Sequence, residues 1–123
     1  VRGVSHEEFR ELMATCRVAV VSMRGGLLHS GGQQTFLNSM YLGKPTVVVG
    51  RRVADGYVED GVNGFVVDYG DSAALREVLA GLWDSEELRR AVGARAREYA
   101  SGMTTESFMK VILEHAREVA RLR

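Results

Sequence analysis

A short polar segment near the start of the chain carries the residues best suited to bind a ligand. Residues 29–35 read HSGGQQT, and an apolar run with helical spacing follows at once. Paired glycines let an anion approach the backbone closely, and the amides and dipole of a helix N-terminus favour negative charge. The spacing alone is equally compatible with a phosphate-binding helix N-terminus and with a merely structural turn. The residues expected to contact a diphosphate are Gly31, Gly32, Gln33, Gln34 and Thr35.

Two arginines follow predicted strands and add positive charge beside this segment. Arg24 comes after a strand expected at 18–23, and Arg51 comes after a strand expected at 46–49. Guanidinium groups bind phosphate oxygens in pairs. Ligands of open parallel sheets lie beyond the carboxyl ends of the strands, so both arginines would face the diphosphate if the two strands are neighbours. No Ser/His/Asp arrangement or carboxylate pair identifies a general base, and the catalytic residues stay unknown.

Three short apolar runs predict the β-strands that must position these residues. The runs are 18–21, 46–49 and 65–67. A continuous apolar run is typical of a strand that is buried on both faces of a parallel sheet. The long loop at 50–64 contains a possible helical turn at 56–60 and a glycine-bearing turn at 61–64.

Helical periodicity predicts the remaining elements. A capping box at Ser5 starts the first helix, which places Cys16 on an apolar face as a buried structural thiol. A helix of about ten residues follows the HSGGQQT segment and stops at Gly43. Three helices close the chain. One is capped by Asp71, one is capped by Asp84 or Ser85, and the last, at about 105–122, is started by Thr104 or Thr105.

Strands that alternate with helices indicate a parallel sheet with right-handed crossovers. We therefore predict a single α/β domain over residues 1–123, with a three-layer α/β/α Rossmann-like sheet and extra C-terminal helices. Complete nucleotide-binding domains of this kind have five or six strands. The chain is accordingly expected to be the second half of such a domain, in which residues 1–3 are the stub of an earlier strand.

The composition excludes several classes of protein. Sixteen basic and sixteen acidic side chains cancel, which argues against a nucleic-acid partner. No apolar run is long enough for a transmembrane segment. The single cysteine forbids an internal disulfide and fits a cytoplasmic, reducing compartment. The three histidines are scattered and have no cysteine partners, so no metal site is expected. Fourteen of the sixteen basic residues are Arg, which is associated with GC-rich bacterial genomes.

Several segments fit one family pattern when they are taken in series. They are 3–9 (GVSHEEF), 16–21 (CRVAVV), 38–48 (NSMYLGKPTVV), 57–67 (YVEDGVNGFVV), 70–75 (GDSAAL), 86–89 (EELR) and 93–97 (GARAR). In this order, over roughly residues 3–110, they resemble the carboxyl-terminal, donor-binding domain of GT-B glycosyltransferases, group 1 and family 4-like. The resemblance implies that the full enzyme transfers a sugar from a nucleotide diphosphate sugar to an unidentified acceptor. It implies no cofactor and no metal.

The resemblance also implies roles for single residues. The HSGGQQT segment would hold the donor diphosphate, and His29, Ser30 and Asn38 would lie against the sugar and ribose. The family pattern has glutamates at the positions of Ser30 and Asn38. An amide or hydroxyl offers fewer acceptors than a carboxylate. The difference fits a divergent subfamily, an altered donor, or a domain that no longer catalyses.

The family's active site lies between two domains, which has consequences for partners. The amino-terminal domain and the first half of this domain would have to come from a longer chain or from a partner chain, and the 123 residues alone are expected to be inactive. The apolar stripe of the last helix would face that missing domain or a second copy in a homodimer. The full-length protein is expected in the cytoplasm, either free or peripheral to the membrane.

Two other classes of function stay open. One is a non-catalytic, Rossmann-like interaction module, which the residues at 30 and 38 favour. The other is a related GT-B nucleotide-sugar epimerase, for which the only argument is the fold.

Overall fold

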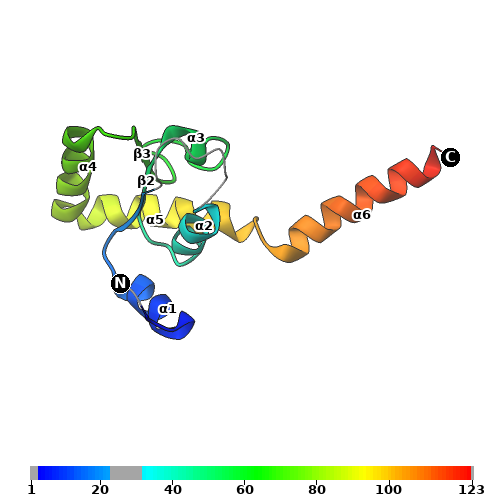
Figure 1. Ribbon diagram of the computed structural model, residues 1–123, viewed down its shortest axis with the longest axis horizontal. Helices are drawn as coiled ribbons and strands as arrows, with labels where there is room; N and C mark the ends of the chain where they lie inside the picture. The colour runs from blue at the N-terminus through cyan, green and yellow to red at the C-terminus, as the bar shows by residue number, and fades with distance from the viewer. Residues whose placement is uncertain (1–2, 23–31, 123) are drawn as a thin grey trace.

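The computed structural model of the chain describes residues 3–22 and 32–122 (Figure 1). Its elements in chain order are α1 (His6–Thr15), β1 (Ala19–Ser22), α2 (Gln33–Tyr41), β2 (Thr46–Val49), α3 (Arg51–Ala54), β3 (Phe65–Val67), α4 (Ser72–Asp84), α5 (Glu86–Ser101) and α6 (Thr105–Arg121). The three strands form one parallel sheet in the order β1-β2-β3. The predicted α/β class and the alternation of strands with helices are confirmed.

The central strand β2 carries the core of the domain. All four of its residues are buried, and side chains alternate between the two faces of the sheet. Val48 packs into a cluster with Phe36 and Met40 of α2 and with Ala96 of α5. Val47 packs on the other face with Leu82 of α4. Helices therefore cover both faces, which confirms the three-layer α/β/α arrangement.

The first strand differs from its prediction. Only Val21 of β1 is buried, and Val20 is 45% exposed. The reason is position, because β1 is an edge strand of the sheet that the described residues form. An apolar run predicts a strand, but it does not determine how many faces of that strand are covered.

Two further expectations are corrected. The helical turn between β2 and β3 is α3 at Arg51–Ala54, directly after the left-handed Gly50, and residues 56–60 are not helical.

Cys16 lies beyond the end of α1 in an extended conformation, and its thiol is only half-buried. The thiol lies 3.1 Å from the carbonyl oxygen of Met13, so hydrogen bonding contributes to its environment as well as packing.

Side-chain caps begin most of the helices where the sequence predicts them. In α1 the Ser5 amide donates to the Glu8 carboxylate at 2.7 Å and the Glu8 amide donates back to the Ser5 hydroxyl at 3.2 Å, which forms the predicted capping box. The first of these bonds lowers the pKa of Glu8. The caps of α4, α5 and α6 are Asp71, Ser85 and Thr104.

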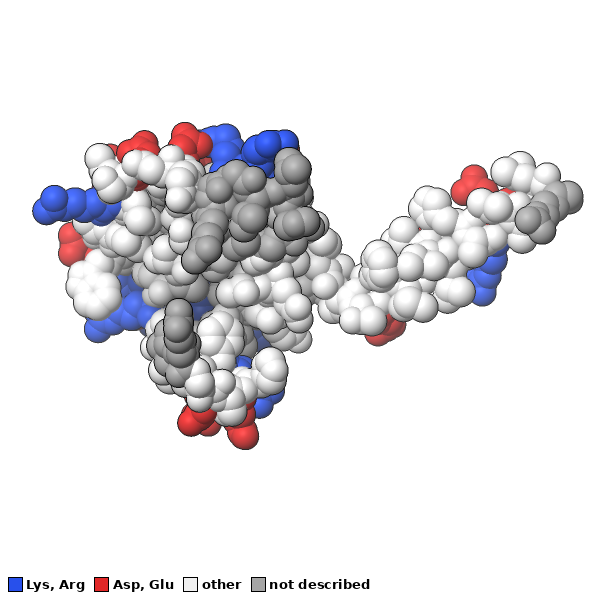
Figure 2. Space-filling model, viewed as in Figure 1, with Lys and Arg blue, Asp and Glu red and all other residues white. Residues whose placement is uncertain are grey.

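Helix α6 projects away from the rest of the molecule (Figures 1 and 2). None of its residues is buried. Its exposed apolar side chains are Phe108, Met109, Val111, Ile112, Leu113 and Val119, with Leu122 just beyond. The helix covers nearly the span of about 105–122 that the sequence predicts. Phe108 and Val111 near its start share a cavity with Leu37 and Tyr57, and no described helix or strand packs along the rest of its apolar stripe.

Helices α2 and α5 meet where two glycines remove the side chains. Gly93 of α5 is buried, and a Cβ atom built on it would overlap the carbonyl oxygen of Gly43. Gly43 itself has φ +72°, which ends α2 and turns the chain toward β2. The close approach lets α5 lie directly against the end of α2.

We predict that Gly93→Ala destabilises the domain by about 3 kcal/mol, because the added methyl group must push the two helices apart. Urea unfolding followed by far-UV circular dichroism measures the change. The matched control is Gly81→Ala in α4, where an added Cβ meets nothing within 4 Å. That variant should gain about 0.5 to 1 kcal/mol from helix propensity. Equal stability of the Gly93→Ala variant and the wild type would contradict the close approach.

Candidate functional site

The start of α2 lies at the carboxyl edge of the sheet, as the sequence predicts. Strands β1 and β2 are parallel neighbours, with Ala19 beside Thr46 and Ser22 beside Val49. Because α2 is the crossover between them, it begins at the carboxyl edge and ends at the amino edge. Of the residues predicted to hold a diphosphate, Gly32, Gln33, Gln34 and Thr35 therefore stand together at the edge where ligands of such sheets bind.

The N-terminus of α2 differs from those of the four capped helices. Its N-cap is Gly32, at φ 80° and ψ −9°, a left-handed conformation that glycine adopts without strain. No side chain of the described residues accepts a hydrogen bond from its first turn. The carbonyl of Gly32 accepts from the amide of Phe36 at 3.0 Å, which starts the helical ladder. The preceding amides are donors that point out of the helix end.

Four predicted site residues cannot be placed. Arg24, His29, Ser30 and Gly31 lie outside the described residues, and their roles stay predictions.

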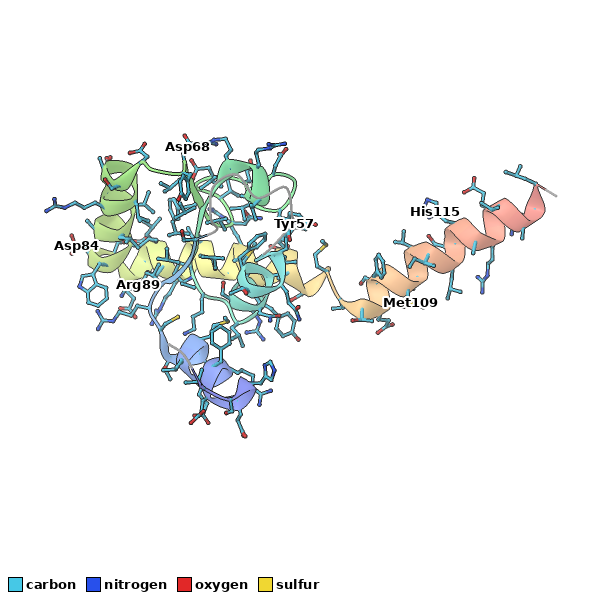
Figure 3. The ribbon with its side chains drawn as sticks, in the orientation of Figure 1. Tyr57, Asp68, Asp84, Arg89, Met109 and His115 are labelled. Carbon is cyan, nitrogen blue, oxygen red and sulfur yellow. The ribbon has the colours of Figure 1, made fainter. Side chains whose placement is uncertain are left out.

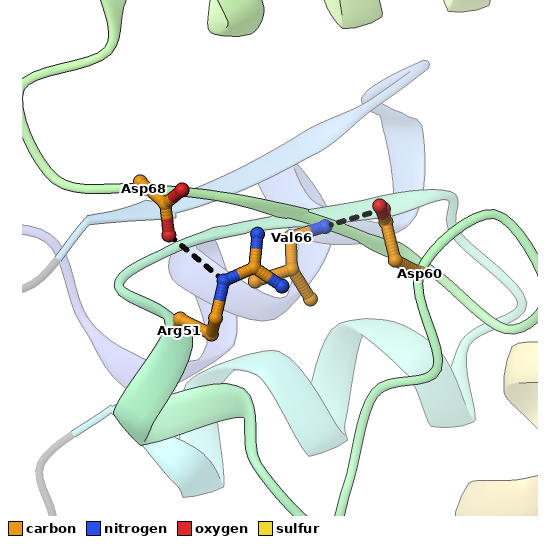
Figure 4. A network of polar contacts seen from close by, with 4 residues as sticks. All are labelled: Arg51, Asp60, Val66 and Asp68. Carbon is orange, nitrogen blue, oxygen red and sulfur yellow. Dashed lines mark hydrogen bonds and ion pairs between the residues drawn. The ribbon is translucent and has the colours of Figure 1, made fainter.

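Arg51 is at the expected edge but has a protein partner. It opens α3 directly after β2, and its Nε donates to Oδ1 of Asp68 at 2.9 Å (Figure 4). Asp68 follows β3, so the ion pair joins the ends of two neighbouring strands. Hydrogen bonding and the negative charge of Asp68 raise the pKa of Arg51. Both side chains are about three-fifths exposed, so the pair is accessible and can exchange for another anion.

Asn38 lies one turn into α2, on the side that faces α1. It is exposed and lines a groove of about 760 Å³ between the two helices. The groove also brings His6 and Arg10 of α1 next to α2. The capping-box pattern at residues 5–8 predicts the start of α1 but does not predict this pairing with α2. The helical spacing of His6, Arg10 and Met13 is the signal that could have placed them on one face.

The DGVNG segment at 60–64 has a structural role in this chain. The side-chain oxygen of Asn63 accepts from the amide of Glu59 at 2.8 Å, and its amide donates to the carbonyl of Tyr57 at 3.1 Å. Asp60 accepts from the amide of Val66 at 2.9 Å (Figure 4). These bonds fold the loop onto the start of β3. Two of the motif's polar side chains thus hold the sheet edge in place.

The described residues, 3–22 and 32–122, contain neither a candidate metal cluster nor a candidate membrane-spanning helix. No group of three or more His, Cys, Asp or Glu side chains there could hold a metal ion. No helix in those ranges is long and apolar enough to cross a membrane.

Residues 1–99 match the family described as "Glycosyl transferases group 1". The matched region contains α1 through most of α5 and includes every predicted site residue. A search of curated proteins finds no match to the chain.

We predict that Asn63→Ala destabilises the domain by about 2 kcal/mol, because a buried side chain loses two hydrogen bonds and leaves their backbone partners unpaired. Thermal and urea unfolding measure the loss. Asp68→Asn is the control, since it changes only the exposed contact with Arg51. The stability of this variant should stay close to that of the wild type. If Asp68→Asn lowered the free energy of unfolding more than Asn63→Ala does, the structural role of Asn63 would be contradicted.

Proposed function

The chain belongs to the group 1 glycosyl transferase family, and on that premise we propose that it is the back half of a donor-binding domain, which holds the diphosphate of a nucleotide diphosphate sugar. The longer enzyme transfers that sugar to an acceptor whose site lies on an amino-terminal domain. The observation that supports the proposal most strongly is the N-terminus of α2. It has no side-chain cap among the described residues, carries a left-handed glycine and stands at the carboxyl edge of the sheet.

The described residues of this helix N-terminus act through their backbone. The amides of Gln33, Gln34 and Thr35 donate to the diphosphate oxygens, and Gly32 lets those oxygens approach because it has no Cβ. The charge that grows on the leaving diphosphate is stabilised by donors that are already in place. The Thr35 hydroxyl adds a side-chain donor, and Gly31, which lies outside the described residues, belongs to the same proposed site.

Two arginines supply positive charge in this proposal. Arg51 exchanges its exposed partner Asp68 for a phosphate oxygen when the donor binds. Arg24, which lies outside the described residues, is the second arginine of the proposal. A guanidinium suits this role because it keeps its charge and can bind two oxygens at once.

Asn38, with His29 and Ser30, is proposed to lie against the sugar and ribose. The exposed Asn38 offers an amide donor and a carbonyl acceptor to a hydroxyl pair. Its lack of a carboxylate favours a second candidate function, a non-catalytic module that retains the fold. Sugar transfer by the longer enzyme, lost on Gly32→Ala, would decide for the first function.

Helix α6 is proposed to be covered in the complete enzyme. Its exposed apolar stripe requires an apolar partner surface in water. The amino-terminal domain is the proposed partner, and a second copy of the chain in a homodimer is the alternative. The oligomeric state of the chain in solution, measured by analytical ultracentrifugation, separates the two.

We predict that a nucleoside diphosphate shifts the backbone amide signals of residues 32–35 in a ¹H–¹⁵N NMR titration. The amides of Thr105, Glu106 and Ser107 form the internal control, because Thr104 already caps that helix N-terminus and Glu106 lies in its first turn. Gly32→Ala should weaken the response about tenfold, since a Cβ strains the left-handed conformation and crowds the anion.

The matched variant for this test is Gly61→Ala. Gly61 has φ +78° and no heavy atom within 4 Å of an added Cβ. It precedes β3, at the edge of the sheet opposite the start of α2, so the variant carries similar backbone strain away from that helix N-terminus. Its nucleotide response should equal that of the wild type. Unmoved amides at residues 32–35 with millimolar ligand would refute diphosphate binding by this chain.

A further inference from the structure

A second basic site lies at the opposite edge of the sheet from the proposed donor site. Its cavity of about 480 Å³ is formed by three separate segments: the residues before β1, the residues before β2, and the first turns of α5. The lining is mostly polar and contains the cations Arg17, Lys44, Arg89 and Arg90 with one carboxylate, Glu86. The net charge of the lining is therefore +3, although the chain as a whole is neutral.

Two of these cations are held in position by contacts that do not neutralise them. One Arg89 nitrogen donates to the carbonyl oxygens of Leu82 and Trp83, each at 2.7 Å. Figure 3 shows Arg89 beside the corner between α4 and α5. The Arg17 guanidinium stacks 4.6 Å from the centre of the Trp83 ring. Carbonyl and aromatic partners orient a guanidinium but leave its full charge to attract an anion.

The other two cations complete the charge of the cavity. Arg90 pairs with Glu86 at 3.0 Å, and both of these side chains are largely exposed. Lys44 is half-buried and has no carboxylate within ion-pair distance among the described residues. The charge of Lys44 therefore adds to the positive potential of the cavity and stays available to an anion.

The two basic groups of the molecule are separated by the sheet. The cavity lies at the amino ends of β1 and β2, whereas Arg51 lies at the carboxyl end of β2. Four residues of extended strand span about 13 Å. In Figure 2 one group of blue side chains lies over α3 and another lies between the lower end of α4 and α1. One ligand of moderate size cannot occupy both.

We propose that this cavity binds a phosphate-bearing anion, either a soluble phosphate ester or the phosphate headgroup of a lipid. Positioned guanidinium groups favour phosphate over chloride because they match its oxygens in pairs. The cavity volume is in the range of small-ligand sites. This binding is separate from the proposed donor binding and does not depend on it.

The single tryptophan of the chain makes the test specific. Trp83 lies under Arg17 at the rim of the cavity, and an anion that engages Arg17 changes the fluorescence of that indole. The probe is inorganic pyrophosphate, titrated into the 123-residue chain at constant ionic strength so that general screening does not vary. A saturable change in Trp83 fluorescence is expected.

Three variants locate the binding. Lys44→Glu should weaken the fluorescence response about tenfold or more, because it replaces an attractive charge with a repulsive one. Arg76→Glu on α4 is the control of equal charge change, since Arg76 lines a different cavity, and its response should stay within about twofold of the wild type. Arg51→Ala should leave the Trp83 response unchanged, which keeps a failure at the donor edge distinguishable from a failure here.

A second arm separates the two sources of phosphate. Co-sedimentation with phosphatidylcholine vesicles, with and without phosphatidylglycerol, tests for a headgroup. Binding of pyrophosphate alone identifies a soluble ligand, and binding of anionic vesicles that Lys44→Glu abolishes identifies a lipid; either supports the proposal. No saturable response in either arm, or equal weakening by Lys44→Glu and Arg76→Glu, would overturn it.

Discussion

The close contact between Gly93 of α5 and the carbonyl of Gly43 fixes the geometry on which the rest of the domain depends. It anchors the end of α2 against α5, and the same two helices supply Phe36, Met40 and Ala96 to one face of β2. With its end fixed at the amino edge, α2 must begin at the carboxyl edge. One contact that only glycine permits thereby sets where the N-terminus of α2 lies, the one proposed to bind an anion. It also sets where Lys44, the next residue after Gly43, enters the basic cavity.

The two edges of the sheet are built by different means. At the carboxyl edge, the site consists of a helix N-terminus and an arginine whose partner is exposed. At the amino edge, Arg17 and Arg89 are oriented by an aromatic ring and by helix carbonyls. The first arrangement depends on backbone amides and changes little when surface side chains vary. The second depends entirely on side chains, so it can be gained or lost without any change of fold.

Local chemistry explains which features the sequence could predict. Helix N-caps can be recognised in the sequence because each cap is a hydrogen bond between residues three positions apart. The N-caps of this kind are Ser5, Asp71, Ser85 and Thr104. Equally local patterns predict the strands at 46–49 and 65–67 and the end of α2 at Gly43. No local pattern predicts the exposure of Val20, because that exposure depends on which elements lie beside β1. The helix at Arg51–Ala54 was misplaced since Gly50, not the apolar pattern, starts it. The basic cavity was missed because its four cations come from three distant segments.

The projecting helix α6 behaves mechanically as a lever arm. It is attached through a short link at Gly102 and Met103, and its length of about 25 Å is rigid because the helical ladder is continuous. A rotation of about 10° at the link displaces its far end by roughly 4 Å. The direction of the helix is therefore dictated by whatever surface receives its apolar side chains. Small differences in that surface would be amplified along the helix, whereas the sheet that carries the two proposed anion sites would not move.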